Sequence, residues 1–182
     1  MSLRNTEQSF GSVAKFFHWS IALFIIGLLI AGLTMVNMPT TPSKFKIYGL
    51  HKSFGIMVLI LAVLRLGWKA NNIAPLLPQT LNFIEKTLAH VGHGFLYFLM
   101  FAMPLSGWLM SSASGFTVSV FGWFTLPNLI GPDAALKRTF VNIHETLAWI
   151  LIAMITLHVL AALLHHFYYK NGVLRRMLPW VK

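Results

Sequence analysis

IHETLAWILIAMITLHVLAALLHHFYYK, residues 143–170, is the stretch that decides the fold. It exceeds the ~20 apolar residues that a helix needs to cross a bilayer, and two tyrosines and a lysine close it as at a membrane interface. It nevertheless contains four histidines, His144, His158, His165 and His166. Polar side chains are rare inside such segments and are mostly functional. The histidines therefore indicate a site within a membrane helix.

The spacing of two of these histidines indicates what they bind. His144 and His158 lie fourteen residues apart. This is just under four helical turns, so their side chains share one helix face about 21 Å apart along the axis. Two haems stacked between helices would each take an axial imidazole from such a face, and histidine is a common haem ligand. Other helices must then supply the opposite ligands.

The composition is that of an integral membrane protein. Of the 182 residues, 57% are hydrophobic and only 10% are charged, and the mean hydropathy is +0.70, unlike soluble globular domains. The chain has no cysteine, which excludes disulfides, thioether-attached haem, iron–sulfur clusters and a thiol nucleophile. The apolar run after residues 1–15 is too long for a signal-peptide core. We expect it to remain as the first helix.

Apolar runs and proline-containing breaks divide the chain into four helices within a single membrane domain, 1–182. The expected spans are about 13–35, 47–68, 88–110 and 142–168. Pro39 and Pro42 are expected to stop the first helix and force a short turn. The aromatic segment at about 111–138 is expected to be an amphipathic connection in the membrane interface. The predicted fold class is all-α, an integral membrane four-helix bundle that binds two haems between its helices.

Basic residues at the edges of the apolar runs indicate the orientation. The net charge is +10, but no soluble domain is expected that could carry a nucleic-acid groove. With a cytoplasmic N-terminus, nine basic residues lie inside and five outside, so the positive-inside rule predicts that both termini are cytoplasmic. The five basic residues outside would be explained if they attract an anionic substrate to the outer face. The inside set is Arg4, Lys15, Arg65, Lys69, Lys86, Lys170, Arg175, Arg176 and Lys182, and the outside set is Lys44, Lys46, Lys52, Lys137 and Arg138.

The depths of four histidines in the predicted helices match in pairs. His18 begins the first helix near the cytoplasm, where it faces His158, and His51 begins the second helix near the outside, where it faces His144. These pairs predict two bis-histidine haem sites, so the third helix need not ligate. A haem beside its ligand tolerates only a small residue one turn further on. The residues four positions after the four histidines are Ala22, Gly55, Ala148 and Ala162.

Two charged residues near these sites have alternative interpretations. Arg65 lies at the level of His158, so it is expected either to pair with a haem propionate or to extend its charged end to the cytoplasmic interface. Glu145 follows His144 directly, so it either orients this ligand or caps the start of the fourth helix.

The remaining histidines lie near the cytoplasmic ends of the third and fourth helices, and they are His90, His93, His165 and His166. They predict a quinone pocket, because a quinone being reduced takes up protons and an imidazole is a natural donor near neutral pH. Interfacial histidines without chemistry are the alternative. His165 is the first choice as donor, because it lies seven residues after His158 and on nearly the same face.

Several segments together resemble a known family. The segments FHWSIA (17–22), GLHKSFG (49–55), LAHVGH (88–93), HETLA (144–148) and LHVLAALLHHF (157–167) are similar to those of the bacterial cytochrome b561 family of four-helix, di-haem membrane proteins. The resemblance covers essentially the whole chain and implies location in the bacterial inner membrane. It further implies haem b ligation by His18, His51, His144 and His158 and electron exchange with the quinone pool. It is closest to stand-alone members that oxidise superoxide to O2 and reduce ubiquinone through two haems.

Three hypotheses follow from these observations. The first is a superoxide:ubiquinone oxidoreductase, in which Lys44, Lys46, Lys52, Lys137 or Arg138 attracts the anion. The second is a cytochrome b subunit that passes electrons from a partner redox enzyme to the quinone pool. The third is a haemless transport or metal-binding protein, which would be colourless when pure.

Overall fold

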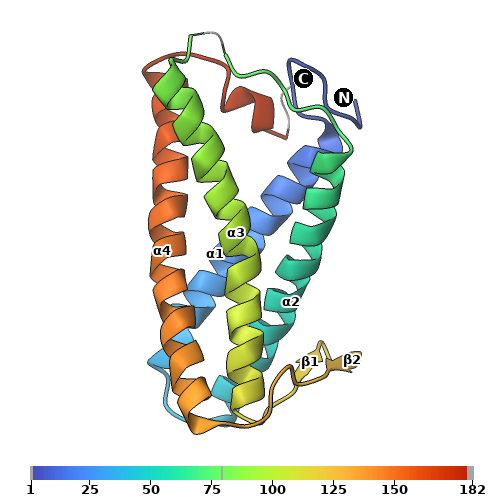
Figure 1. Cartoon of the computed structure of the whole chain (residues 1–182), viewed down its shortest axis with the longest axis vertical. Coiled ribbons are helices and arrows are strands. Elements are labelled where there is room, and N and C mark those ends of the chain that lie inside the picture. The colour runs from blue at the N-terminus through green and yellow to red at the C-terminus, as the bar shows by residue number, and fades with distance from the viewer. Residues whose placement is uncertain (1, 79, 180–182) are drawn as a thin grey trace.

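The computed structural model describes residues 2–78 and 80–179, which are mainly helical. The four long helices are α1 (Ser12–Val36), α2 (Pro42–Ala70), α3 (Phe83–Ala113) and α4 (Ala134–Phe167), and the two termini lie together at one end of the bundle (Figure 1). A hairpin of β1 (Val118–Val120) and β2 (Phe124–Leu126) lies at the opposite end, and the short 3-10 helix η1 (Arg175–Met177) follows α4. We name these the terminal end and the hairpin end.

Each of the four helices is long and apolar enough to cross a membrane. The shortest of them, α1, has 25 residues and spans about 37 Å, more than the ~30 Å hydrocarbon core of a bilayer. Large apolar side chains cover the outward faces, among them Leu23, Ile30, Leu64 and Leu160. Apolar surfaces of this extent are unfavourable in water and favourable in lipid. The fold is therefore an all-α, multi-pass membrane bundle, as the sequence predicts.

Two of the helices begin earlier than their apolar runs indicate. α2 starts at Pro42 rather than near residue 47. A proline is tolerated in the first helical turn, because the backbone N–H that it lacks would have no hydrogen-bond partner within the helix there. α3 starts at residue 83 rather than near 88, behind a capping box in which Asn82 and Glu85 bond each other's backbone amides. α1 ends at Val36, ahead of Pro39 and Pro42, and Pro42 is itself the first residue of α2. The first turns are partly polar, so hydropathy alone does not detect them.

α4 also begins early, at Ala134 rather than near residue 142. The carboxylate of Asp133 caps it by accepting hydrogen bonds of 2.8 Å from the backbone amides of Ala135 and Leu136. Glu145 lies about three turns further along the helix and is exposed. The interpretation of Glu145 as the cap of this helix is therefore wrong, and part of the expected interfacial connection is helical.

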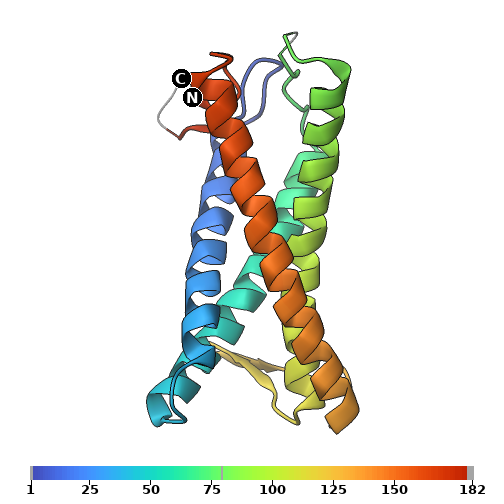
Figure 2. The same cartoon turned by 90° about the vertical axis from the view of Figure 1, so that its left-hand side faces the viewer.

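The connection between α3 and α4 contains a β-hairpin that hydropathy did not predict. Phe121 and Gly122 at its tip have φ values of 51° and 76°. Positive φ values at both central residues are typical of the type I′ turn, whose twist matches that of the two paired strands. A bulky residue is strained there, but contacts with α2 hold Phe121 in place. Its N–H donates to Ser53 Oγ at 3.1 Å and its ring lies 5.0 Å from that of Phe54. Ser53 Oγ also donates to Ser119 O at 3.0 Å. The hairpin is thus fastened to α2 across the end of the bundle (Figure 2).

All four helices contribute to one buried apolar layer midway along the bundle. Its members are Ile21, Ile25, Val58, Ala62, Leu99, Met100 and Leu151. Along each helix, these apolar residues lie between two positions occupied by histidine, arginine, serine or glycine, one toward each end of the bundle. The layer therefore separates two polar levels, one toward the terminal end and one toward the hairpin end.

Candidate functional site

Four histidines meet in two pairs, one on each side of the apolar layer. The terminal-end pair consists of His18 of α1 and His158 of α4, with ring centroids 6.2 Å apart. The hairpin-end pair consists of His51 of α2 and His144 of α4, with ring centroids 6.4 Å apart. The structure thus brings together the histidines that were matched by their depth in the sequence.

Both separations fit a metal held between two rings. Imidazoles bound to opposite sides of one metal have centroids about 6.4 Å apart, from a metal–nitrogen bond of about 2 Å and a centroid-to-nitrogen distance of about 1.2 Å on each side. His93 of α3 also contacts His158, but their centroids are only 5.5 Å apart. The two pairs therefore have the spacing of axial ligands, and the contact between His93 and His158 is too short for it.

Hydrogen bonds at His144 leave one nitrogen available to a metal. His144 Nδ1 lies 2.9 Å from Ser106 Oγ of α3, and this hydroxyl donates its proton to the carbonyl oxygen of Met103 at 2.8 Å. When His144 binds a metal through Nε2, its proton lies on Nδ1 and Ser106 Oγ can accept it. Histidines that bind metals are usually fixed by a partner in this way.

The hairpin-end pair lies against two glycines. A Cβ atom at Gly107 of α3 would meet His144 Cε1 at 3.1 Å, and one at Gly32 of α1 would meet His51 Cε1 at 3.5 Å. Gly107 thus allows α3 to pass closer to the imidazole than any other residue would. His51 Nδ1 is buried without a hydrogen-bond partner in the described part of the chain, so this ring does not serve a structural hydrogen bond. These observations fit haem at both pairs.

Basic groups without a carboxylate surround the terminal-end pair. Arg65 Nη2 lies 3.3 Å from His18 Nδ1, and the Arg65 guanidinium and the Lys69 ammonium lie 5.4 and 4.7 Å from the ring centroid of Tyr97. Arg65 points at the histidine pair and does not reach outward to the interface. This cluster suits an anionic group beside the pair.

The four histidines that were expected to form a quinone pocket have different partners in the structure. His93 joins the terminal-end pair, with its Nδ1 bonded to Ala89 O at 2.6 Å, and His90 is exposed with its Nδ1 bonded to the preceding turn. His165 Nδ1 lies 2.9 Å from Asn171 Nδ2. His166 instead lines a separate cavity with Lys170.

The candidate attractors of an anion all lie toward the hairpin end, but their ammonium groups differ in availability. Lys46 is exposed. Lys44 Nζ donates to Met38 O at 2.7 Å, and Lys52 Nζ donates to Ser111 Oγ at 2.8 Å and lies 5.6 Å from the ring centroid of Phe116. Lys137 and Arg138 are exposed in the first turns of α4. The inside set of basic residues lies toward the terminal end, except Lys182, which is outside the described residues.

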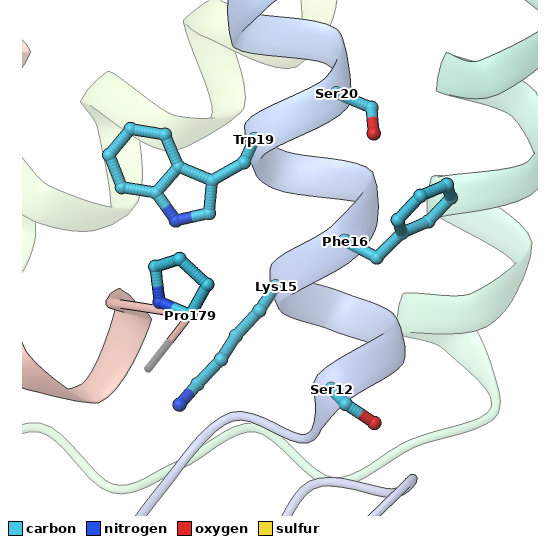
Figure 3. A pocket seen from close by; sticks show the side chains of 6 residues that line it. All are labelled: Ser12, Lys15, Phe16, Trp19, Ser20 and Pro179. Carbon is cyan, nitrogen blue, oxygen red and sulfur yellow. The ribbon is translucent and has the colours of Figure 1, made fainter. Parts of the chain in front are cut away.

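A second feature of the terminal end is a cavity of about 280 Å³ beside α1, lined by Ser12, Lys15, Phe16, Trp19, Ser20 and Pro179 (Figure 3). Trp19 follows His18 in the chain, its ring lies 5.3 Å from that of His18, and its Nε1 donates to Met177 O at 2.8 Å. The segment after α4 is thereby fixed next to the helix that carries His18.

Sequence reasoning missed two contributions of α3 to the hairpin-end pair. Ser106 and Gly107 contact His144, whereas His93, which was expected at the cytoplasmic end of the third helix, contacts His158. The adjacent Ser106 and Gly107 within an apolar helix were the available signal, because serine and glycine in a membrane helix often mark close contact with another helix.

Comparisons with known proteins agree with this geometry. A family model described as prokaryotic cytochrome b561 matches residues 9–180. The chain is 36% identical over 180 residues to cytochrome b561 homolog 2 of Escherichia coli, covering 98% of this chain and 95% of that protein. It is 32% identical over 165 residues to the probable superoxide oxidase CybB of Yersinia pestis, covering 89% and 91%. It is 30% identical over 172 residues to cytochrome b561 homolog 1 of E. coli, covering 93% and 97%.

Proposed function

Because the chain belongs to the prokaryotic cytochrome b561 family of electron-transfer membrane proteins, which bind haem b, we propose that it binds two haems and moves electrons from superoxide to ubiquinone. The observation that carries this proposal is the pair of imidazole separations, 6.2 and 6.4 Å, at two levels of one bundle. His18 with His158 would hold one haem, and His51 with His144 would hold the other. Two bound haems supply one-electron centres along the axis of the bundle.

The electron balance of this reaction requires two substrates at two surfaces. Two superoxide anions each lose one electron and become O2, and one ubiquinone gains two electrons and two protons. Superoxide reacts at the hairpin end, which faces the outside, and both termini are cytoplasmic, in accord with the charge distribution of the loops. The likeness to the Yersinia pestis protein supports superoxide as the donor.

His165 is the proposed proton donor to the quinone. The amide of Asn171 is oriented by its Oδ1, which accepts from the backbone N–H of Val173 at 3.4 Å, so its Nδ2 faces His165 Nδ1. An amide nitrogen only donates, so His165 Nδ1 accepts and Nε2 carries the proton. This tautomer presents an N–H group that a quinone oxygen can accept.

Arg65 is proposed to pair with a haem propionate at the terminal-end pair. A guanidinium only donates, so in the contact with Arg65 the Nδ1 atom of His18 accepts and the proton lies on Nε2. Metal coordination through Nε2 requires the opposite tautomer, whose Nδ1 cannot accept from Arg65. Haem ligation therefore releases the guanidinium, and a propionate is the anion that suits it together with Lys69.

The exposed charge of Lys46, with Lys44 and Lys52 beside it, is proposed to attract superoxide. Replacing Lys44, Lys46 and Lys52 by Gln should slow reduction of the protein by superoxide by about tenfold at low ionic strength and flatten the salt dependence, because a positive surface raises the encounter rate of an anion. The control is Arg4→Gln with Lys86→Gln, which removes charge at the terminal end. Equal rates and salt slopes in the lysine variant and the wild type would remove these lysines from the proposal.

The second candidate is an electron-transfer subunit without a substrate of its own. Two of the relatives carry names that specify only a cytochrome b561 homolog, which supports this coarser function. Purified protein that contains haem but is not reduced by superoxide, and that co-purifies with a larger redox enzyme, would favour the subunit over the oxidase.

A further inference from the structure

A small basic cavity lies where α4 ends, on the part of the bundle that neither histidine pair uses. Its volume is about 280 Å³, and its lining consists of His166, Lys170, Asn171, Gly172 and Arg175. The last turn of α4 contributes His166, and the loop and η1 contribute the other four. The chain turns back at Lys170, which has a left-handed φ of 50°. This turn brings Arg175 to the same cavity as His166.

The charges around this cavity are unbalanced. Lys170 and Arg175 are exposed and His166 is half-buried, and no carboxylate of residues 2–78 and 80–179 lines the cavity. The chain has only four acidic residues, and none of them lies beyond position 145. Two permanent positive charges and an imidazole around one small space repel one another unless an anion lies between them. The composition of the lining therefore selects an anion with several acceptor oxygens.

The position of the cavity identifies the source of that anion. α4 leaves the apolar region at Phe167, and the exposed rings of Tyr168 and Tyr169 follow directly, as expected where a helix crosses the headgroup region. Leu160, Leu163 and Leu164 are exposed on the preceding turns, which gives acyl chains an apolar surface next to the cavity. We propose that the cavity binds the phosphate group of an anionic phospholipid, with its acyl chains along α4.

The loop is held in the shape that this site needs. Asn171 N donates to His165 O at 3.1 Å, and its side chain bonds His165 and Val173. Arg176 N donates to Gly172 O at 3.1 Å. Most of the ordering is therefore complete before a lipid arrives, which reduces the entropy lost on binding. The site uses none of the proposed haem ligands, although Asn171 connects it to His165, the proposed proton donor.

The test is a lipid titration of the full-length, haem-loaded protein in detergent, followed by native mass spectrometry. Phosphatidylglycerol is compared with phosphatidylcholine for the wild type and for Lys170→Gln with Arg175→Gln. The matched control is Lys137→Gln with Arg138→Gln, which removes the same charge from the opposite end of the same helix. Lys170→Arg with Arg175→Lys tests whether charge suffices. A further arm adds inorganic phosphate at the concentration of the lipid.

We expect the wild type, the control and the charge-retaining variant to bind phosphatidylglycerol more tightly than phosphatidylcholine. The Gln variant should bind phosphatidylglycerol about thirtyfold more weakly, from the loss of two basic groups near an anionic headgroup, and phosphatidylcholine unchanged. An equal loss of phosphatidylglycerol affinity in the Gln variant and in the control would overturn the proposed site. Displacement of phosphatidylglycerol by equimolar inorganic phosphate would overturn the lipid assignment, because the anion alone would then suffice.

Discussion

The hydroxyl of Ser106 provides the sharpest test of the hairpin-end pair. It accepts from His144 Nδ1 at 2.9 Å and donates to Met103 O at 2.8 Å. A ligand that donates a hydrogen bond from its far nitrogen is a stronger electron donor, which stabilises ferric over ferrous iron. Ser106→Ala removes this hydrogen bond and leaves the imidazole proton with the backbone carbonyl of Met103 as its acceptor. The midpoint potential of the haem at this pair should therefore rise.

The magnitude follows from the strength of one hydrogen bond. A neutral hydrogen bond contributes about 1 kcal/mol, which corresponds to about 40 mV for a one-electron couple. This shift in midpoint potential is an upper limit, because it assumes that the hydrogen bond stabilises only the ferric state. The substitution should also weaken haem retention by about 10- to 100-fold, as is usual when a partner of a metal-bound histidine is removed.

The assay is a spectroelectrochemical titration that resolves two haem components. Ser112→Ala is the matched control, because Ser112 is also a buried serine of α3 and its hydroxyl donates to Trp108 O and accepts from the backbone amide of Leu129. In Ser106→Ala one component should shift upward while the other remains at its wild-type potential. An identical titration for both variants and the wild type would refute the role assigned to Ser106.

Three further predictions concern the ligands and the topology. His51→Ala and His158→Ala should each remove one of two low-spin b-type components from the reduced-minus-oxidised spectrum, whereas His93→Ala should keep both; a colourless wild type would contradict the haem sites altogether. The ring planes of the two pairs are 70° and 74° apart, so the ferric protein should give two strongly anisotropic low-spin EPR signals, and signals typical of parallel imidazoles would contradict these orientations. Since the chain has no cysteine, Lys46→Cys should react with an impermeant maleimide in intact spheroplasts and Lys170→Cys only after permeabilisation; the reverse pattern would invert the proposed orientation.

The features predicted from sequence are those that depend on one helix at a time. Run length and hydropathy predict four membrane helices, and the structure confirms them. The depth of a histidine within its helix follows from counting residues, because the rise per residue is fixed. Depth alone therefore selected His18 to face His158 and His51 to face His144, and the structure brings these rings together. Their role as ligands stays a prediction.

The features missed are those that depend on how one helix is rotated against another. Ser106 and Gly107 face His144 only because α3 presents that side to α4, and a single sequence does not fix this rotation. The early start of α4 was missed because Asp133 and the following polar turns stabilise the helix outside the apolar run. The hairpin was missed for a similar reason, since Phe121 adopts its positive φ through contacts with Ser53 and Phe54, far away in sequence.

The attachment of the hairpin to Ser53 bears on how the protein acquires its cofactors. Ser53 lies two residues after His51 on the same end of α2 and bonds the hairpin twice. The hairpin is followed by residues 127–133 and then by α4, which bears His144 in its third turn. The hairpin and this connection therefore link the helix that carries His51 to the helix that carries His144. The terminal-end pair has a similar brace, because Trp19 Nε1, next to His18, donates to Met177 O in the segment that follows α4. The protein should therefore hold the imidazoles of both pairs near each other before haem binds at either pair.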